Sequence, residues 1–262
     1  MFNPVLFPKY LNDIKKELKR HQFGWKDFSC DPIPGSCISI VSKISPEIRS
    51  SILECSDGNI PPSYSSSVDL LVGDKWSKLA QNALSFNHPI KDELESVIDT
   101  LLFAEGSVFI ATSALHRGFV ICINPLQNNR EWSSEKLLLE IIHEETHLSL
   151  DMLFLLFPPQ EVFDKKKWAC LQNAFVFTRL TQISDELDIL KCFKDENLKL
   201  AKYFRQECTD ILNNIAPCWC EILSNWVDPI LNGNPNPLAD ILPNASYIPH
   251  DLTNKIVEWD ER

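Results

Sequence analysis

Two histidines and a glutamate stand at a spacing that can bind a metal ion and use it. The segment HEETH, from His143 to His147, has the form HExxH. Residues four apart share one face of a helix, so the two imidazoles can present ring nitrogens to a single ion. Glu144 is offset by one position and can reach water bound to that ion. This spacing indicates metal-assisted catalysis, with His143 and His147 as ligands and Glu144 as the catalytic carboxylate.

The residues around the motif predict a buried helix. The segment LLLEIIHEETHLSLDMLFLLF is apolar on almost every side, with Leu137, Ile141 and Leu148 on one stripe. Burying two imidazoles and several carboxylates destabilises a fold unless other groups satisfy them. A metal ion would do so, and hydrogen bonds within the core are the alternative. The pair does not select the metal, because two histidines suit Zn(II) and, with a third ligand and open positions, also non-haem Fe(II).

A third metal ligand has to come from outside the motif. In the later segment WACLQNAFVFTRL, Gln172, Val176 and Arg179 are spaced to share one helix face, which makes Gln172 the nearest candidate by position. An amide oxygen is a weak ligand for zinc or iron, so other side chains stay open as ligands or as groups that orient a ligand. They are Asp151, Glu161, Asp185, Glu186, His116 and His250.

Most of the chain is predicted to be helical, from apolar residues at spacings of three and four. The predicted helices are 8–20, 45–56, 68–86, 91–103, 135–157, 166–190 and 196–223. A change of period predicts two short strands, at 107–112 and 118–124. Loops are expected at CDPIPGSC and in the tail that contains DPILNGNPNPLADILP. We therefore expect an α+β fold that is mainly α, with a small β-sheet next to the buried metal-binding helix in a zincin-like strand–helix arrangement.

One catalytic domain is expected across residues 1–262. Its predicted parts are an N-terminal helical part (1–104), a core with the strands, the HExxH helix and the next helix (105–190), and C-terminal helices with an irregular tail (191–262). The N-terminal part is expected to shape a substrate groove. Ser133 or Ser134 is expected to cap the metal-binding helix.

Composition and charge narrow the classes of partner. The 36 acidic and 25 basic side chains give a formal net charge of −11, which disfavours nucleic acid as a partner. No apolar run is long enough to cross a bilayer, and the first residues lack the order of a signal peptide. The nine cysteines are scattered without a CxxC pair, which is typical of reduced thiols. We expect a cytoplasmic protein that binds neither nucleic acid nor membrane.

Three segments in the middle of the chain resemble a known family. They are Ser113 with the strand Gly118 to Asn124 that follows it, the HExxH segment with Leu148 shortly after it, and the pattern LQNAF from Leu171 to Phe175. Over residues 107–183 their order is similar to that of the HExxH-motif peptide-modifying proteins found with ribosomally made peptide clusters. Those proteins are described as iron(II)- and 2-oxoglutarate-dependent peptide β-hydroxylases.

The resemblance implies an oxygenase that uses Fe(II) and 2-oxoglutarate to hydroxylate residues of a precursor peptide. His143 and His147 would hold the iron, and Gln172 stands where a histidine would be an obvious third ligand. The far carboxylate of 2-oxoglutarate needs a cation, for which a guanidinium is suited. Arg179, on the face of Gln172, is the first candidate, and Arg117, just before the strand, is the second. The acidic net charge is compatible with a basic peptide.

Two other functions remain open. A zinc metallopeptidase would use the same two histidines as ligands and Glu144 as general base toward zinc-bound water. The residues alone favour this function, although no HExxHxxGxxH extension follows the motif. A relative without catalysis would bind a peptide or a partner enzyme, and the glutamine at position 172 would be its sign. The hydroxylase predicts oxygen-dependent formation of succinate, and the peptidase predicts peptide cleavage that a chelator blocks. The relative without catalysis predicts neither.

Overall fold

The chain packs into two compact units, and each is described by itself. The sheet unit is Lys19–Leu148, and the helical unit combines Met1–Leu18 with Ser149–Arg262. The boundary falls within helix α5 (Ser134–Leu156). The computed structural model describes residues 15–16, 18–19, 26–54, 69–105, 111–113, 118–127, 130–156, 165–208, 220 and 223–233.

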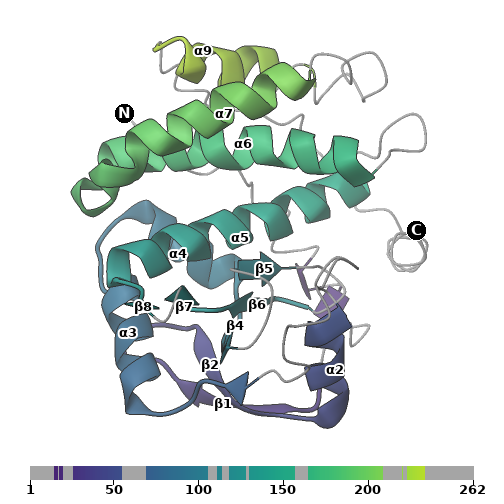
Figure 1. Cartoon of the computed structure of the whole chain (residues 1–262), viewed down its shortest axis with the longest axis vertical. Coiled ribbons are helices and arrows are strands. Elements are labelled where there is room, and N and C mark those ends of the chain that lie inside the picture. The colour runs from purple at the N-terminus through teal and green to yellow at the C-terminus, as the bar shows by residue number, and fades with distance from the viewer. Residues whose placement is uncertain are drawn as a thin grey trace. The chain divides into compact units, whose positions relative to one another are not determined.

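A mixed sheet of six strands forms the centre of the sheet unit (Figure 1). The order is β1-β2-β4-β6-β5, with β3 paired to β4 beside this path. β4 is parallel to β2 and β6, whereas β5 is antiparallel to β6 and, within the described residues, ends the sheet. The strands are β1 (Phe28–Pro32), β2 (Ser39–Ile44), β3 (Asp69–Leu70), β4 (Thr100–Glu105), β5 (Ala111–Ser113) and β6 (Val120–Ile123), and β7 (Leu126–Gln127) pairs separately with β8 (Arg130–Glu131).

Helices cover both faces of the central strand β4. Leu102 belongs to a buried cluster with Ile48 of α2 (Pro46–Glu54). The next residue, Phe103, meets Trp76 of α3 (Asp74–Leu84) edge-on, with ring centroids 6.3 Å apart. Because successive residues of a strand point to opposite faces, α2 and α3 cover opposite faces of the sheet, as Figure 1 shows.

The prediction of a helix over 91–103 is wrong in its second half. Helix α4 (Pro89–Val97) ends six residues before the predicted end, and β4 begins at Thr100. From Thr100 to Ala104 every residue of β4 is buried. A parallel strand that is covered on both faces shows an unbroken apolar run instead of an alternation, so its period cannot be told from that of a buried helix.

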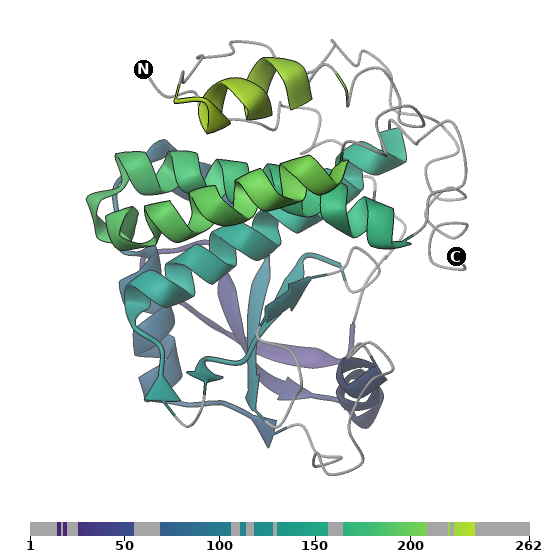
Figure 2. The same cartoon turned by 45° about the horizontal axis from the view of Figure 1, so that its top comes forward.

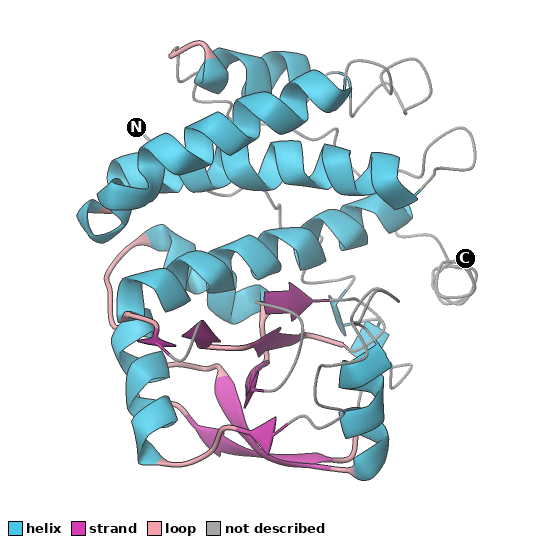
Figure 3. Cartoon of the chain, in the orientation of Figure 1, coloured by secondary structure: helices cyan, strands magenta, loops and turns pink. Residues whose placement is uncertain are grey.

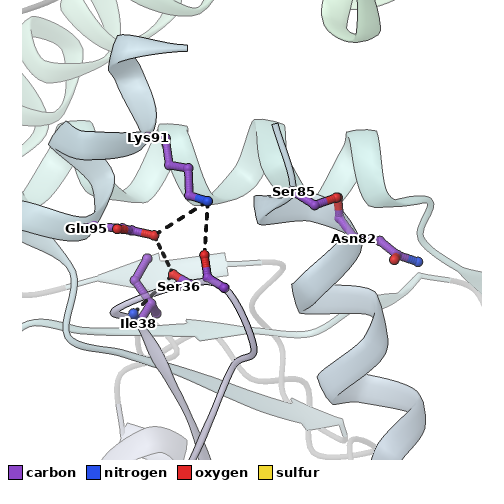
Figure 4. A network of polar contacts seen from close by, with 7 residues as sticks. Ser36, Ile38, Asn82, Ser85, Lys91 and Glu95 are labelled. Atoms are coloured by element: carbon purple, nitrogen blue, oxygen red, sulfur yellow. Dashed lines mark hydrogen bonds and ion pairs between the residues drawn. The ribbon is translucent and has the colours of Figure 1, made fainter. Parts of the chain in front are cut away.

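The predicted loop CDPIPGSC is partly sheet, because it contains the end of β1 and the turn that leads to β2. Ser36 N donates to Ile33 O at 3.1 Å across this turn, and Gly35 has a φ of +78°, which favours glycine. Figure 4 shows how α4 holds the turn: Ser36 Oγ donates to Glu95 Oε1 at 2.8 Å and Lys91 Nζ donates to Gly35 O at 3.1 Å. The predicted N-terminal helical part is therefore mixed, since it holds β1 to β4 as well as helices.

In the helical unit, α6 (Lys165–Glu186) and α7 (Lys194–Glu207) run side by side and antiparallel (Figure 2). Phe177 stacks on Phe204 with ring centroids 5.6 Å apart, and Asn197 Nδ2 donates to Ser184 Oγ at 3.4 Å. The short helix η2 (Asp188–Phe193) connects the pair, and η5 (Leu223–Val227) and α9 (Asp228–Leu231) follow. Arg205 of α7 forms two hydrogen bonds with Asp228, at 2.7 and 2.9 Å.

The expected fold class is confirmed in its coarse form, a mainly helical protein with a small mixed sheet (Figure 3). The helices predicted at 45–56 and 135–157 and the strand at 118–124 are confirmed with shifted ends. The helix predicted at 68–86 is wrong at its start, where Asp69–Leu70 pairs with β4 as strand β3, and the helix predicted at 166–190 ends at Glu186. Of the strand predicted at 107–112, residues 107–110 lie outside the described residues. So do most of 8–20, residues 209–219 and the tail after 233. The single catalytic domain stays a prediction. No helix among the described residues is both long and apolar enough to cross a membrane.

Candidate metal centre

Helix α5 carries the HExxH motif in its middle, as the sequence predicts. It begins at Ser134, and Ser133 Oγ accepts a hydrogen bond from Lys136 N at 3.3 Å, which satisfies one of the free amides of the first turn. Within residues 141–150, only His143 and His147 are half-buried, and every other residue is buried. The two imidazoles therefore occupy the part of this segment that a ligand can reach.

The two imidazoles point their Nε2 atoms at each other. The His143 and His147 Nε2 atoms lie 3.1 Å apart, and the ring centroids are 4.9 Å apart. Two nitrogens that bind one ion at about 2.0–2.1 Å are about 3.3–3.4 Å apart in a tetrahedral site and about 2.8–3.0 Å apart at a right angle. The observed separation falls between these values, so the donor pair fits one ion. An N–H···N hydrogen bond between neutral rings has the same length.

Burial keeps His143 neutral. Desolvation, helped by the positive charge of Lys136, lowers the pKa of His143 from 6.5 to about 4. A metal ion binds the neutral form of imidazole, so near neutral pH no proton has to leave His143 before an ion binds. The lowered pKa of His143 thus agrees with the geometry of the pair as metal ligands.

The Glu144 carboxylate is held by the edge of the sheet. The side chain is 6% exposed, and Ser113 Oγ of β5 lies 2.8 Å from its Oε2 atom. The same hydroxyl lies 2.9 Å from the Glu144 carbonyl oxygen. The sequence placed Ser113 only as a landmark before a strand, and its contact with Glu144 was missed. A short hydroxyl residue on an edge strand near an HExxH helix is the signal that points to such a contact.

The helical unit holds a different polar pair. Gln172 Nε2 on α6 donates to Asp151 Oδ1 on α5 at 2.6 Å. Burial raises the pKa of Asp151 from 3.8 to about 7, and hydrogen bonding from Trp168 and Gln172 offsets part of that rise. Asp151 therefore orients the Gln172 amide through its nitrogen, and the amide oxygen is the atom with ligand character. Gln172 as third metal ligand stays a prediction.

Arg179 is deeply buried. At 1% exposure it is the largest side chain of the described core that is almost wholly buried, so it does not form an ordinary surface ion pair. A guanidinium keeps its charge inside a protein and is buried only where anionic or polar groups surround it. Its predicted role toward 2-oxoglutarate stays a prediction, and Arg117 lies outside the described residues.

The other candidate ligands divide into two groups. Asp185 forms an ion pair with Lys194 at 2.5 Å on the exposed side of α6, and burial raises the pKa of Glu186. Glu161, His116 and His250 lie outside the described residues. Among the residues that are described, no three His, Cys, Asp or Glu side chains are placed to hold one ion. The histidine pair is thus the part of the predicted ligand set that the structure brings together.

Comparison of the sequence with known proteins identifies no family for this chain. No protein-family model matches the chain, and no curated protein matches its sequence.

Proposed function

We propose that this protein is a metal-dependent peptide-modifying enzyme that β-hydroxylates residues of a precursor peptide with Fe(II) and 2-oxoglutarate. The observation that carries the proposal is the 3.1 Å separation of the His143 and His147 Nε2 atoms on a half-buried helix face. Two imidazoles that converge in this way suit a two-histidine iron site that keeps positions open for a co-substrate. Iron with 2-oxoglutarate supplies the oxidising chemistry when bound.

The roles of the chain's own residues follow from their surroundings. His143 and His147 hold the ion, and Glu144 orients a water molecule or ligand beside it. Gln172 is the proposed third ligand, through its amide oxygen. Arg179 is the proposed partner of the far carboxylate of 2-oxoglutarate, because a guanidinium–carboxylate pair is strongest away from water.

A peptide substrate is supported by the end of the sheet. Strand β5 is half-exposed, pairs with β6 on one side, and contacts Glu144 through Ser113. An extended peptide can add to such an edge through main-chain hydrogen bonds. It would then pass close to the HExxH segment.

The buried Glu144 favours one second candidate, a zinc metallopeptidase. A carboxylate that is 6% exposed and fixed by a serine hydroxyl is suited to take a proton from metal-bound water. The same ligand pair would hold zinc. The two proposals share the metal site and differ in the metal and in the product.

Anaerobic titration of metal-free protein with Fe(II) and 2-oxoglutarate tests the first proposal. We expect a saturable visible charge-transfer band in the wild type, its loss in His143→Ala, and its retention in His88→Asn. His88 is a matched control because its side chain caps α4 at Ile90 N and asparagine can do the same. A protein that instead keeps zinc through purification and cleaves peptides in a chelator-sensitive way supports the peptidase.

The third ligand is tested in the same titration. If Gln172 binds the iron, Gln172→His should tighten Fe(II) binding, because an imidazole is the stronger donor, and Gln172→Ala should weaken it. Equal affinities in all three proteins would remove Gln172 from the ligand set and leave the histidine pair in place.

A further inference from the structure

Ser113, on the edge strand β5, contacts both the side-chain carboxylate and the backbone carbonyl of Glu144. Its Oγ atom is 2.8 Å from the Glu144 carboxylate and 2.9 Å from the Glu144 carbonyl oxygen. A hydroxyl has one proton to donate and shares it between these two acceptors. The Glu144 carboxylate must therefore stay near Ser113 Oγ, which also contacts the Glu144 carbonyl. This restricts the side-chain torsions of Glu144.

The hydroxyl donor, Ser113, belongs to a strand that is paired into the sheet. Ser113 is paired with Ile121 in β6, and β6 is in turn paired with β4 in the middle of the sheet. Every residue of β6 is buried. The glutamate belongs to α5, so the contact fixes the position of a helix side chain relative to the sheet. Such fixed partners determine how precisely a site residue is held.

We infer that Ser113 is a positioning residue that holds the Glu144 carboxylate for its work on metal-bound water or ligand. This inference rests on the proposed function, in which Glu144 acts next to the ion. Both contacts of the hydroxyl are with Glu144, so its loss should affect turnover more than metal binding. Threonine keeps the hydroxyl and suits a strand, whereas alanine removes it.

The first experiment separates turnover from binding. Ser113→Ala should lower kcat by about 10–100-fold, as is typical for groups that orient a catalytic residue, with KM and Fe(II) affinity within about twofold of the wild type. Ser113→Thr should recover most of the loss. Ser42→Ala is the matched control, because Ser42 lies in the same sheet and its Oγ donates only to the Ser29 carbonyl, at 3.3 Å. An unchanged kcat in Ser113→Ala, or an equal fall in Fe(II) affinity, overturns the inference.

The second experiment needs no activity. In metal-free protein, Ser113→Ala should lower the unfolding midpoint by about 2–4 °C for each kcal/mol of hydrogen-bond energy lost. The same change in a Glu144→Ala background should lower the midpoint by less, because the carboxylate acceptor is gone and only the backbone carbonyl of residue 144 remains for the hydroxyl. Additive shifts would show that the two side chains are not coupled and would overturn the inference. A coupled pair in a protein that binds no Fe(II) would instead overturn the proposed function and leave the contact established.

Discussion

The polar side chains of α5 are satisfied in two different ways, one in each unit. In the sheet unit, His143 and His147 are half-buried and turn their ring nitrogens toward each other. In the helical unit, Asp151 is bound by the amide of Gln172 on α6. The first pair consists of two ring nitrogens that can share an ion, whereas in the second pair a hydrogen-bond donor already meets an acceptor. The comparison teaches that one buried helix satisfies its polar side chains differently at successive turns: two ring nitrogens face each other at one, and a carboxylate accepts from an amide at the next.

The largest expected effect comes from breaking the histidine pair. His147→Ala should weaken Co(II) or Fe(II) binding more than about 100-fold, beyond the 10–100-fold typical of residues that only orient a ligand. Asp151→Asn should leave the affinity nearly unchanged, because it retains an acceptor for Gln172. Calorimetric titration of both variants measures the difference. Equal losses would mean that the Asp151 carboxylate contributes to metal binding as much as His147 does.

A change at Glu144 separates chemistry from metal binding within the sheet unit. Glu144→Gln keeps the size of the side chain and its contact with Ser113 but removes its capacity to accept a proton. We expect turnover to fall by about 10²–10⁴-fold, the usual contribution of a positioned acid or base, with the metal retained. Metal content by atomic emission and product formation by mass spectrometry measure the two quantities. Full activity in this variant would exclude Glu144 from catalysis.

The two pairs should also respond to pH with opposite signs. The pKa of His143 is lowered to about 4, so the unfolded chain takes up a proton first as pH falls, and stability is lost between about pH 6.5 and 4. The pKa of Asp151 is raised to about 7, so the folded protein takes up a proton first, and this stability is lost as pH rises from about 4 to 7. Each slope is at most about 1.4 kcal/mol per pH unit.

Asp151→Asn removes the second contribution and leaves the first. The free energy of unfolding of the metal-free variant should therefore fall more steeply than that of the wild type as pH is lowered from 7 to 4. Urea unfolding at several pH values measures both slopes. Parallel curves would show that Asp151 ionises alike in the folded and unfolded protein.

The smallest expected effect comes from an ion pair away from both polar pairs. Arg205→Lys replaces the two hydrogen bonds to Asp228 by a single contact. Because this pair is only half-buried, we expect a loss of about 0.5–1.5 kcal/mol in the free energy of unfolding and no change in metal affinity. Urea unfolding and metal titration measure the two quantities, and altered metal binding would show that the helical unit affects the histidine pair.

Local patterns predicted much of the fold. The apolar spacing of α5 and the position of His143 and His147 on one face follow from the helical period, which depends only on residues close in sequence. The strand β6 could also be predicted, because Val120, Ile121 and Ile123 are β-branched and the strand lies between turn residues. β4 could not be predicted, because a strand that is buried on both faces is a continuous apolar run without the alternation of polar and apolar residues that indicates a strand.

The sequence by itself determined the motif, the helix that carries it and the mainly apolar surroundings of that helix. Only the tertiary structure decided that Ser113 meets Glu144, that Gln172 donates to Asp151, and that Arg179 is buried. These contacts join residues 31 and 21 positions apart, or depend on what covers a helix face. Such contacts depend on how the elements pack against each other. Packing between residues far apart in sequence produces no periodic pattern in a local window, so it cannot be predicted from one.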